Sequence, residues 1–512
     1  MSRSTFVKST FILTIAALLS KIVGSVFRIP LQNIAGDEVL GIFSLVYPVY
    51  MVALILSVAG IPLAISKLIA EANAKKDTTS VREIYVTASI LAIIFGIISF
   101  SIIYIFSSPI AALLGGPTTE LALIIVAATL LIAPYMAVYR GFFQGFGDMG
   151  PTAVSQVIEQ LIRAGLILFV AYFLVTRNYS NEIIAGGIMI GSVVGAIASL
   201  LYLRIKYTRS NIKLTKINKY SFSTFSYRSK KILGLSIPIA IGAITMALLN
   251  FVDSFTISYG LRASGVEMSQ VNYLYGIYGR GLSLTQLATV FATSIVLPLV
   301  PLISTQLAAK NESGTTEIIE KVHRITHLIS WPAAIGLLAI TLPLNLALFT
   351  NLEGSSMIAI INFSSVFASL SILGTGILQG INYAKTAAII ILVGVALKAI
   401  INIYFIQYLG LDGAALSTLI VYIFIFVMNT IYIYKHFQFT ITSPATIKII
   451  FSSIIMGVAI GLPTLFVNFE NWSRVGALTY AFVAILIGGT LYLGQLLLLK
   501  VIDKKELRIT GK

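Results

Sequence analysis

Apolar residues occupy the chain in long runs, and short polar stretches that carry most of the charge separate these runs. A helix needs about 20 apolar residues to cross the hydrocarbon core of a bilayer, and each run is at least that long. The pattern predicts an all-α polytopic membrane protein with fourteen transmembrane helices. The expected spans are 9–35, 39–70, 82–107, 121–143, 152–176, 183–205, 232–259, 271–308, 322–350, 356–380, 385–409, 412–434, 444–468 and 475–500.

The composition agrees with this interpretation, since 57% of the 512 residues are hydrophobic and only 11% are charged. The formal net charge is +16, from 35 basic and 19 acidic residues. Most basic residues fall at the termini and in even-numbered loops, with the densest run between Arg204 and Lys231. The positive-inside rule then places both termini in the cytoplasm. The basic excess therefore reflects topology and contact with membrane lipids, and a nucleic-acid partner is not expected.

Three short strings recur at nearly one spacing, which predicts a duplicated half. Each pair lies in the corresponding helix of a six-helix block, so the two halves share one orientation. The recurring strings are Gly141–Gly145 with Gly376–Gly380, Thr152-Ala153 with Thr386-Ala387, and Pro62-Leu63 with Pro298-Leu299.

The repeat divides the chain into four parts. We expect an N-lobe of six helices over 1–206, a basic cytoplasmic linker over 207–231, a C-lobe of six helices over 232–438, and two further helices with a cytoplasmic tail over 439–512. Two parallel lobes joined by a linker can rock about a central cavity, which is a transporter architecture.

Basic residues inside the expected spans are candidates for substrate binding. A charged side chain at membrane depth costs at least ~2.5 kcal/mol, so each one needs a partner, a cavity or a function. Lys21 and Arg28 lie seven positions apart in the first span and would share a helix face. Arg280 lies between two glycines in the eighth span. These three residues would give a central cavity a cationic wall suited to phosphate or pyrophosphate, although Lys21 and Arg28 could also extend to the two membrane interfaces.

Other charges within spans have more than one interpretation. Glu159 and Arg163 are four positions apart, with the acid first, which favours a structural ion pair within one helix. Asp253, three residues after Asn250, could form an ion-coupling site for Na⁺ or H⁺, or it could pair with Lys398. The sequence does not separate these alternatives.

Several classes of chemistry are not expected. The chain has no cysteine and three histidines, and the spacing of His323 and His327 does not form a metalloprotease motif. We therefore expect no metal site, no cofactor and no enzymatic activity.

The chain resembles the multidrug/oligosaccharidyl-lipid/polysaccharide exporter superfamily, and within it the polysaccharide-transporter branch related to stage V sporulation protein B and the lipid II flippases. The resemblance covers nearly the whole chain. The stretches that carry it are Ser20–Gly24 with Arg28, Gly60–Leu68 (GIPLAISKL), Arg140–Gly145 (RGFFQG), Ser155–Gln160 with Arg163, and Tyr278–Gly281.

This resemblance implies a flippase that moves an undecaprenyl-pyrophosphate-linked saccharide across the bacterial cytoplasmic membrane. We expect it to work by alternating access and as a monomer. Cavity arginines of lipid II flippases match Arg28 and Arg280 here, and Lys21 stands where those relatives often have arginine. No arginine occurs in the second span, where those flippases carry another, so lipid II itself is not specified. The alternative is a cation-coupled multidrug exporter of the same superfamily, for which acidic cavity walls would be expected.

Overall fold

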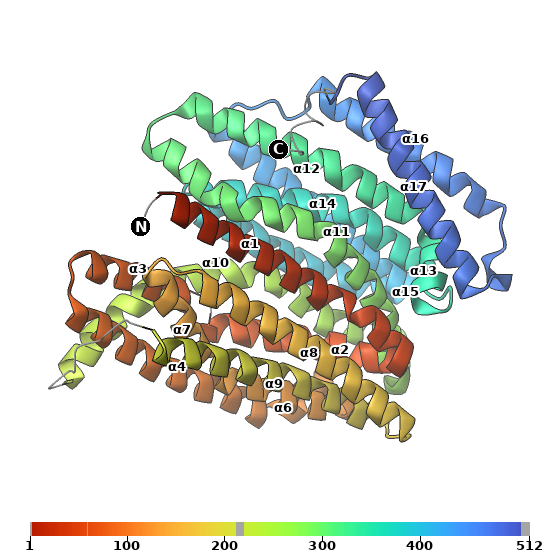
Figure 1. The fold of residues 1–512 in the computed structure, drawn as a ribbon. Coiled ribbons are helices and arrows are strands. Elements are labelled where there is room, and N and C mark those ends of the chain that lie inside the picture. The colour runs from red at the N-terminus through yellow and green to blue at the C-terminus, as the bar shows by residue number, and fades with distance from the viewer. Residues whose placement is uncertain (1–2, 59, 211–219, 503–512) are drawn as a thin grey trace. The chain divides into compact units, whose positions relative to one another are not determined.

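The computed structural model describes residues 3–58, 60–210 and 220–502, and within these ranges it contains helices and their connections but no strand (Figure 1). Ten candidate membrane spans lie in this part of the chain. An eleventh is counted if the bent pair α12 (Glu312–Ala339) and α13 (Thr341–Phe349) forms one span. The chain is therefore an all-α protein with many membrane-spanning helices, as predicted. Two candidates, of 60 and 53 residues, are each long enough for two crossings.

Glycines with positive φ interrupt both of these long candidate spans. Gly36, with φ 81°, interrupts α2 (Arg28–Val58), and Gly410, with φ 57°, interrupts α15 (Ala384–His436). A residue without a Cβ adopts such a backbone at little cost. Both glycines fall in the short gaps between expected spans.

The expected second span, 39–70, is not one continuous helix. It breaks at Gly60, which has φ 85°, and α3 (Ile61–Ala74) begins just after it with Pro62 in its first turn. A Cβ at position 60 would lie 2.3 Å from the carbonyl oxygen of Ser236, which belongs to α10 (Phe222–Ala263). The close approach of α10 and the positive φ both require glycine at this break.

The expected ninth span, 322–350, is also interrupted. α12 and α13 meet at Ile340 with a bend of 76°. A bend of this size leaves the mean hydropathy of the segment unchanged, so the apolar pattern gave no sign of it.

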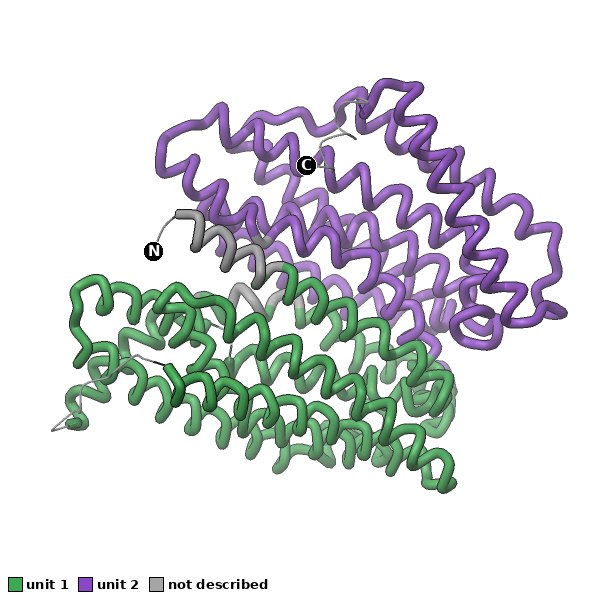
Figure 2. Tube along the Cα trace, viewed as in Figure 1, with its two compact units in different colours: residues 1–262, 266–276 green, residues 263–265, 277–512 purple. Residues whose placement is uncertain are grey.

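Two compact units make up the chain (Figure 2). The first contains residues 1–262 and 266–276, and the second contains residues 263–265 and 277–512. The predicted lobe boundaries at 206 and 232 remain a prediction, and residues 211–219 of the expected linker lie outside the described residues. α10 belongs to the first unit.

The first unit is organised around α8 (Gly150–Thr176), which packs along α9 (Asn181–Thr208) and against α1 (Arg3–Val26). α3 packs along α7 (Ala133–Gly145), and both contact α4 (Thr78–Ile105). The short helices α5 (Ser107–Leu113) and α6 (Glu120–Ala127) complete this unit together with α2 and α10. Its apolar core includes the fully buried Ile65, Ile69, Tyr139 and Phe142.

The second unit contains α11 (Met268–Ala308) from Ile277 onward, α12, α13, α14 (Ser355–Gly380), α15, α16 (Pro444–Leu465) and α17 (Arg474–Leu498). α14 packs along α15, and α12 packs against both α14 and α16. α17 contacts α13 and α16, so the last two helices are joined to the rest of the unit mainly through α12 and α13.

One contact recurs in both units at the spacing of the repeated strings. In the first unit a Cβ at Gly145 would lie 2.7 Å from the Cβ of Ile69. In the second unit a Cβ at Gly380 would lie 3.0 Å from the Cβ of Ile303. Position 380 follows 145 by 235 residues, and 303 follows 69 by 234. The recurrence supports the predicted duplication, because a copied helix pair keeps its closest contact.

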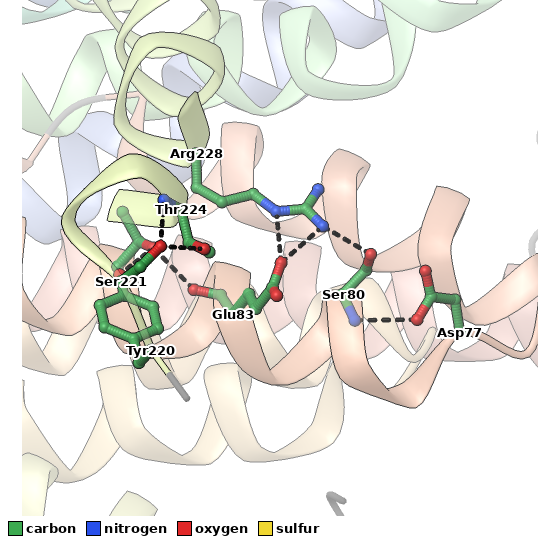
Figure 3. A network of polar contacts seen from close by, with 8 residues as sticks. Asp77, Ser80, Glu83, Tyr220, Ser221, Thr224 and Arg228 are labelled. Atoms are coloured by element: carbon green, nitrogen blue, oxygen red, sulfur yellow. Dashed lines mark hydrogen bonds and ion pairs between the residues drawn. The ribbon is translucent and has the colours of Figure 1, made fainter. Parts of the chain in front are cut away.

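The start of α10 is joined to α4 by polar contacts within the first unit (Figure 3). Arg228 forms an ion pair with Glu83 at 2.8 Å and also donates a hydrogen bond to the Ser80 hydroxyl. The Tyr220 hydroxyl lies 2.6 Å from that of Thr87. These contacts hold the segment that follows residues 211–219 against α4.

Candidate functional site

Arg28 lies where the first expected span is interrupted. α1 ends at Val26 and α2 begins at Arg28, of which only 5% is exposed. Its guanidinium carbon lies 5.4 Å from the ring centre of Phe43 and 5.9 Å from that of Tyr47. Aromatic faces attract cations, and they do not neutralise the charge. Among the described residues no ion pair involves Arg28, and its Nε has no hydrogen-bond partner, so the guanidinium can still bind an anion.

Tyr47 connects Arg28 to a second buried arginine. Its ring stacks on Phe43 with 5.2 Å between centres and lies beside Arg28, while its hydroxyl accepts a hydrogen bond of 3.4 Å from Arg163. Sequence reasoning missed Tyr47. The available signal was the aromatic series Phe43, Tyr47 and Tyr50, whose spacing places three rings on one face of α2.

Glu159 and Arg163 form the expected ion pair, at 2.7 Å, and a second arginine shares the carboxylate. Arg140 on α7 binds the other carboxylate oxygen at 2.8 Å. The side chains of Arg140, Glu159 and Arg163 are 15%, 12% and 7% exposed. Arg140 also donates to Ser155 at 3.0 Å and to Ser199 at 3.1 Å. The cluster therefore holds two cations and one carboxylate, where one pair was expected.

Glycines on α9 bring this cluster together. Gly187, Gly191, Gly195 and Ser199 recur every fourth residue along one face of the helix. A Cβ at Gly191 would lie 2.9 Å from the Arg163 carbonyl oxygen, and one at Gly195 would lie 2.7 Å from that of Glu159. Small residues at this spacing let two helix backbones approach closely in a membrane. The approach of α9 to α8 places Ser199 within reach of Arg140.

Arg280 is fully buried in the second unit, and polar partners surround it. It donates hydrogen bonds to the Oδ1 atoms of Asn351, at 2.6 Å, and Asn345, at 3.4 Å. Its guanidinium carbon lies 5.4 Å from the ring centre of Phe349. Asn345 in turn donates to the Glu353 carbonyl oxygen at 2.9 Å. Arg280 thus holds the connection from α13 to α14, a role that the sequence did not suggest.

Lys21 has a different environment from Arg28. It is exposed, whereas Arg28 is buried. The expectation that they share a helix face assumed one continuous helix, but the helix is interrupted between Val26 and Arg28.

Asp253 lies on α10 in the first unit and is 1% exposed. It interacts electrostatically with Tyr275, whose hydroxyl lies 3.5 Å from that of the adjacent Ser254. The Ser254 hydroxyl also donates to the carbonyl oxygen of Asn250 at 3.2 Å. Asp253 is therefore part of a buried polar group in which Asn250 contributes a backbone oxygen.

Metal-binding side chains are not clustered in the part of the chain that the structure describes, where no group of three or more His, Cys, Asp or Glu could hold an ion. His327 accepts a hydrogen bond of 2.9 Å from the Trp331 indole, and His323 stacks on Phe439 with 5.0 Å between ring centres. Both histidines take part in packing α12.

An apolar hollow of about 390 Å³ lies in the second unit, between α11, α12, α16 and α17. Its walls are almost entirely hydrocarbon, which suits an alkyl or prenyl chain rather than a charged group. The lining includes Leu284, Pro332, Gly336, Met456, Ala484 and Tyr492.

Comparison with known sequences gives a consistent set of relatives. Residues 6–307 match the family described as polysaccharide biosynthesis protein. The uncharacterized membrane protein YabM of Bacillus subtilis is 32% identical over 413 residues, which cover 80% of this chain and 76% of that protein. The lipid II flippase MurJ of B. subtilis is 26% identical, over 96% of this chain and 94% of that protein. Stage V sporulation protein B of the same organism is 29% identical over 81% of each chain.

Solved structures share the fold at low sequence identity. The lipid II flippase MurJ in an inward closed conformation aligns with a TM-score of 0.69 and 18% identity, over 95% of this chain and 98% of that one. An inward-facing multidrug resistance MATE family transporter aligns with a TM-score of 0.64 and 17% identity, over 85% of this chain and 99% of that one. The fold is thus common to proteins described as a flippase and as a drug transporter.

The family match spans more than half of the chain, and YabM extends the similarity toward the C-terminus. The chain therefore belongs to the polysaccharide biosynthesis protein family, within the multidrug/oligosaccharidyl-lipid/polysaccharide exporter superfamily.

Proposed function

We propose that the protein is a flippase that translocates an undecaprenyl-pyrophosphate-linked saccharide, either lipid II or another cell-envelope polysaccharide precursor, across the bacterial cytoplasmic membrane. The observation that carries this proposal is the buried Arg28, whose charge rests on aromatic faces and has no carboxylate partner among the described residues. The relatives described as lipid II flippase and polysaccharide biosynthesis protein support it.

The chemistry of such a substrate matches two environments in this chain. A diphosphate presents paired oxygens, which a guanidinium can bind in bidentate fashion. A polyprenyl chain needs an apolar surface, and the 390 Å³ hollow of the second unit offers one.

The proposed architecture has fourteen transmembrane helices, in two six-helix lobes followed by two C-terminal helices. Both termini lie in the cytoplasm, and a monomer works by alternating access. In this proposal neither nucleic acid nor a cofactor takes part, and the chain performs transport rather than an enzymatic reaction.

We propose different roles for the remaining predicted site residues. Arg280 and Lys21 contribute positive charge to the central cavity, where Arg28 makes the main contact with the headgroup. Asp253 and Asn250 form the site at which Na⁺ or H⁺ couples to transport. The bonds of Arg280 to Asn345 and Asn351 also give it a structural role.

Reconstituted flipping tests the proposal. Purified protein in vesicles is offered lipid II or a teichoic-acid precursor, and headgroup exposure on the far leaflet is measured. Loss of one or two charge-assisted hydrogen bonds, each worth about 1.5–3 kcal/mol, should slow Arg28→Ala at least about tenfold. Arg177→Ala is the matched control, because Arg177 also lies over an aromatic ring, that of Phe173 at 4.5 Å, but is exposed. Equal rates for wild type and Arg28→Ala with both lipids would refute the role given to Arg28.

A cation-coupled multidrug exporter is the second candidate. The buried Asp253 and the similarity in fold to a MATE family transporter favour it. Under this alternative, overexpression raises resistance to a cationic dye, and Asp253→Asn abolishes the gain. If overexpression of neither the wild-type protein nor Asp253→Asn changes dye resistance, the multidrug exporter is excluded.

A further inference from the structure

The cluster of Arg140, Glu159 and Arg163 contains one more positive charge than an ion pair needs. We infer that it is a second anion site of the first unit, which takes the diphosphate class of ligand that Arg28 takes. This inference deepens the proposed function and rests on it for the identity of the natural ligand. That the cluster binds anions is argued from its geometry alone and does not depend on the proposed function.

Charge provides the first argument. Each oxygen of the Glu159 carboxylate binds one arginine, at 2.7 and 2.8 Å, so the carboxylate neutralises only one of the two cations. An uncompensated charge at membrane depth costs about 2.5–3.5 kcal/mol, and a clasp between α7 and α8 would need one arginine. The additional cation is explained if an anion joins the cluster during the working cycle.

Unused donors of Arg163 provide the second argument. Only Nη2 makes a short hydrogen bond, to Glu159 at 2.7 Å. Nη1 contacts the Tyr47 hydroxyl at 3.4 Å, and the buried Nε has no partner. A guanidinium carries five N–H donors, and leaving buried donors unpaired is costly.

Position provides the third argument. Tyr47 contacts Arg163 through its hydroxyl and Arg28 through its ring, so both guanidinium groups lie beside one tyrosine of the first unit. The three side chains of the cluster retain 7–15% exposure. A diphosphate that leaves Arg28 would find the next cation of the first unit across Tyr47.

Glu159 has a specific role in this arrangement. Its carboxylate occupies both arginines when no ligand is bound, and a diphosphate must compete with it. Removing the carboxylate charge should therefore tighten anion binding, whereas removing an arginine should weaken it. A purely structural clasp predicts the reverse for Glu159, because two unpaired cations would only destabilise the fold.

The test measures the melting temperature of the full-length protein in detergent with inorganic pyrophosphate, against sulfate at equal ionic strength. A ligand that binds the folded protein raises its melting temperature in proportion to RT ln(1 + [L]/Kd). We expect apparent pyrophosphate affinity to fall at least about tenfold in Arg163→Gln and to rise at least about tenfold in Glu159→Gln. Arg177→Gln is the control and should match wild type.

Equal pyrophosphate shifts in wild type, Arg163→Gln and Glu159→Gln would overturn the inference. If Arg163→Gln does not accumulate, Glu159→Gln and Arg163→Lys carry the test, since each retains both positive charges. Lysine keeps the charge without the planar fork and should weaken pyrophosphate binding only in part. A Glu159→Gln protein whose affinity for pyrophosphate is unchanged or lower would also overturn it.

Two further arms separate the source of the anion and the proposed function. In nanodiscs, displacement of pyrophosphate from the Arg163-dependent site by phosphatidylglycerol would assign the site to bilayer lipid and overturn its assignment to substrate. If Arg28→Ala slows flipping but Arg163→Gln leaves pyrophosphate binding unchanged, this inference is refuted and the proposed function is not. If Arg163→Gln weakens pyrophosphate binding but Arg28→Ala leaves flipping unchanged, the proposed role of Arg28 is refuted instead.

Discussion

Replacing Arg280 by alanine separates a structural arginine from a substrate-binding one. The substitution removes a fully buried guanidinium and its hydrogen bonds to the Oδ1 atoms of Asn345 and Asn351, although the Asn351 oxygen still accepts from the Glu353 backbone N–H at 3.1 Å. It also removes the charge beside the Phe349 ring. All three partners lie in or just after α13, so the damage should be local to the connection between α13 and α14.

The expected cost follows from these contacts. The 2.6 Å bond from a charged donor to Asn351 contributes about 1.5–3 kcal/mol, and the bond of 3.4 Å to Asn345 contributes less. The contact with Phe349 adds about 0.5–2 kcal/mol. We expect the Arg280→Ala protein to lose about 3 kcal/mol of stability. For a unit of this size, that lowers the melting temperature by about 6–12 °C.

Thermal unfolding in detergent, followed by tryptophan fluorescence, measures this change. Arg474→Ala is the matched control. Arg474 lies on α17 and donates to the Ala347 carbonyl oxygen of α13 at 2.8 Å, but its side chain is exposed. It should cost no more than about 1 kcal/mol. A double-mutant cycle with Asn351→Ala should show coupling, since the two side chains share one bond.

One result would refute this reasoning. If Arg280→Ala melts within 1–2 °C of wild type (about 0.5 kcal/mol on the same scale) and yet abolishes flipping, Arg280 acts on the substrate. The substrate-binding role predicted from the sequence would then hold, and the hydrogen bonds to the asparagines would be incidental to stability. A protein that melts early and flips at a rate matched to its folded fraction supports the structural role.

Substitutions at Asp77, Arg228, Glu83 and Gly195 test the first unit. Asp77 is the N-cap of α4, and hydrogen bonds from Ser80 hold the pKa of its carboxyl below the usual value. The stabilisation of the fold by the Asp77 carboxylate should therefore be present above about pH 4 and lost as pH falls through the folded pKa. Asp77→Ala should speed hydrogen exchange in the first turn of α4, at a cost of about 1 kcal/mol, whereas Asp77→Asn should keep the cap and lose the pH dependence. Arg228→Ala should release the start of α10 and raise its proteolysis, and Glu83→Gln should do so more weakly, because the amide still accepts a hydrogen bond. Gly195→Leu should prevent accumulation, because its side chain would meet the α8 backbone at 2.7 Å. Gly494→Leu on α17 should be tolerated, because a Cβ there would have no atom within 4 Å.

The apolar pattern was sufficient to predict the helices but not where they break. Gly36 and Gly410 fall in gaps that the pattern predicted, because short polar stretches accompany them. The break at Gly60, where φ is 85°, and the bend of 76° at Ile340 both lie inside apolar segments, and neither changes the mean hydropathy. Breaks of this kind depend on what approaches the backbone, as the Ser236 carbonyl oxygen does at Gly60.

In the candidate site, too, contacts within one helix could be predicted from the sequence, whereas contacts between helices could not. Spacing four on one helix predicted the Glu159 and Arg163 pair, since both residues share a helix face. Arg140 lies on another helix, and its approach depends on how closely α9 packs on α8, which the sequence signals only through glycines at every fourth position. Arg28 could be predicted as a cation that either lines a cavity or extends to an interface, but its aromatic surroundings depend on the break at Gly36, which precedes Phe43 and Tyr47.

The buried arginines differ in how fully they are used, and this difference has a functional consequence. Arg280 has two amide oxygens and a ring around it, so an anion would have to displace existing bonds. Arg28 and Arg163 retain buried donors without partners, so an anion would complete their bonding. Because pairing existing donors is favourable and breaking satisfied bonds is costly, anion affinity should reside in the first unit. Substitutions at Arg28 and Arg163 should therefore change transport in a protein that still folds, whereas substitution at Arg280 should first change how much folded protein there is.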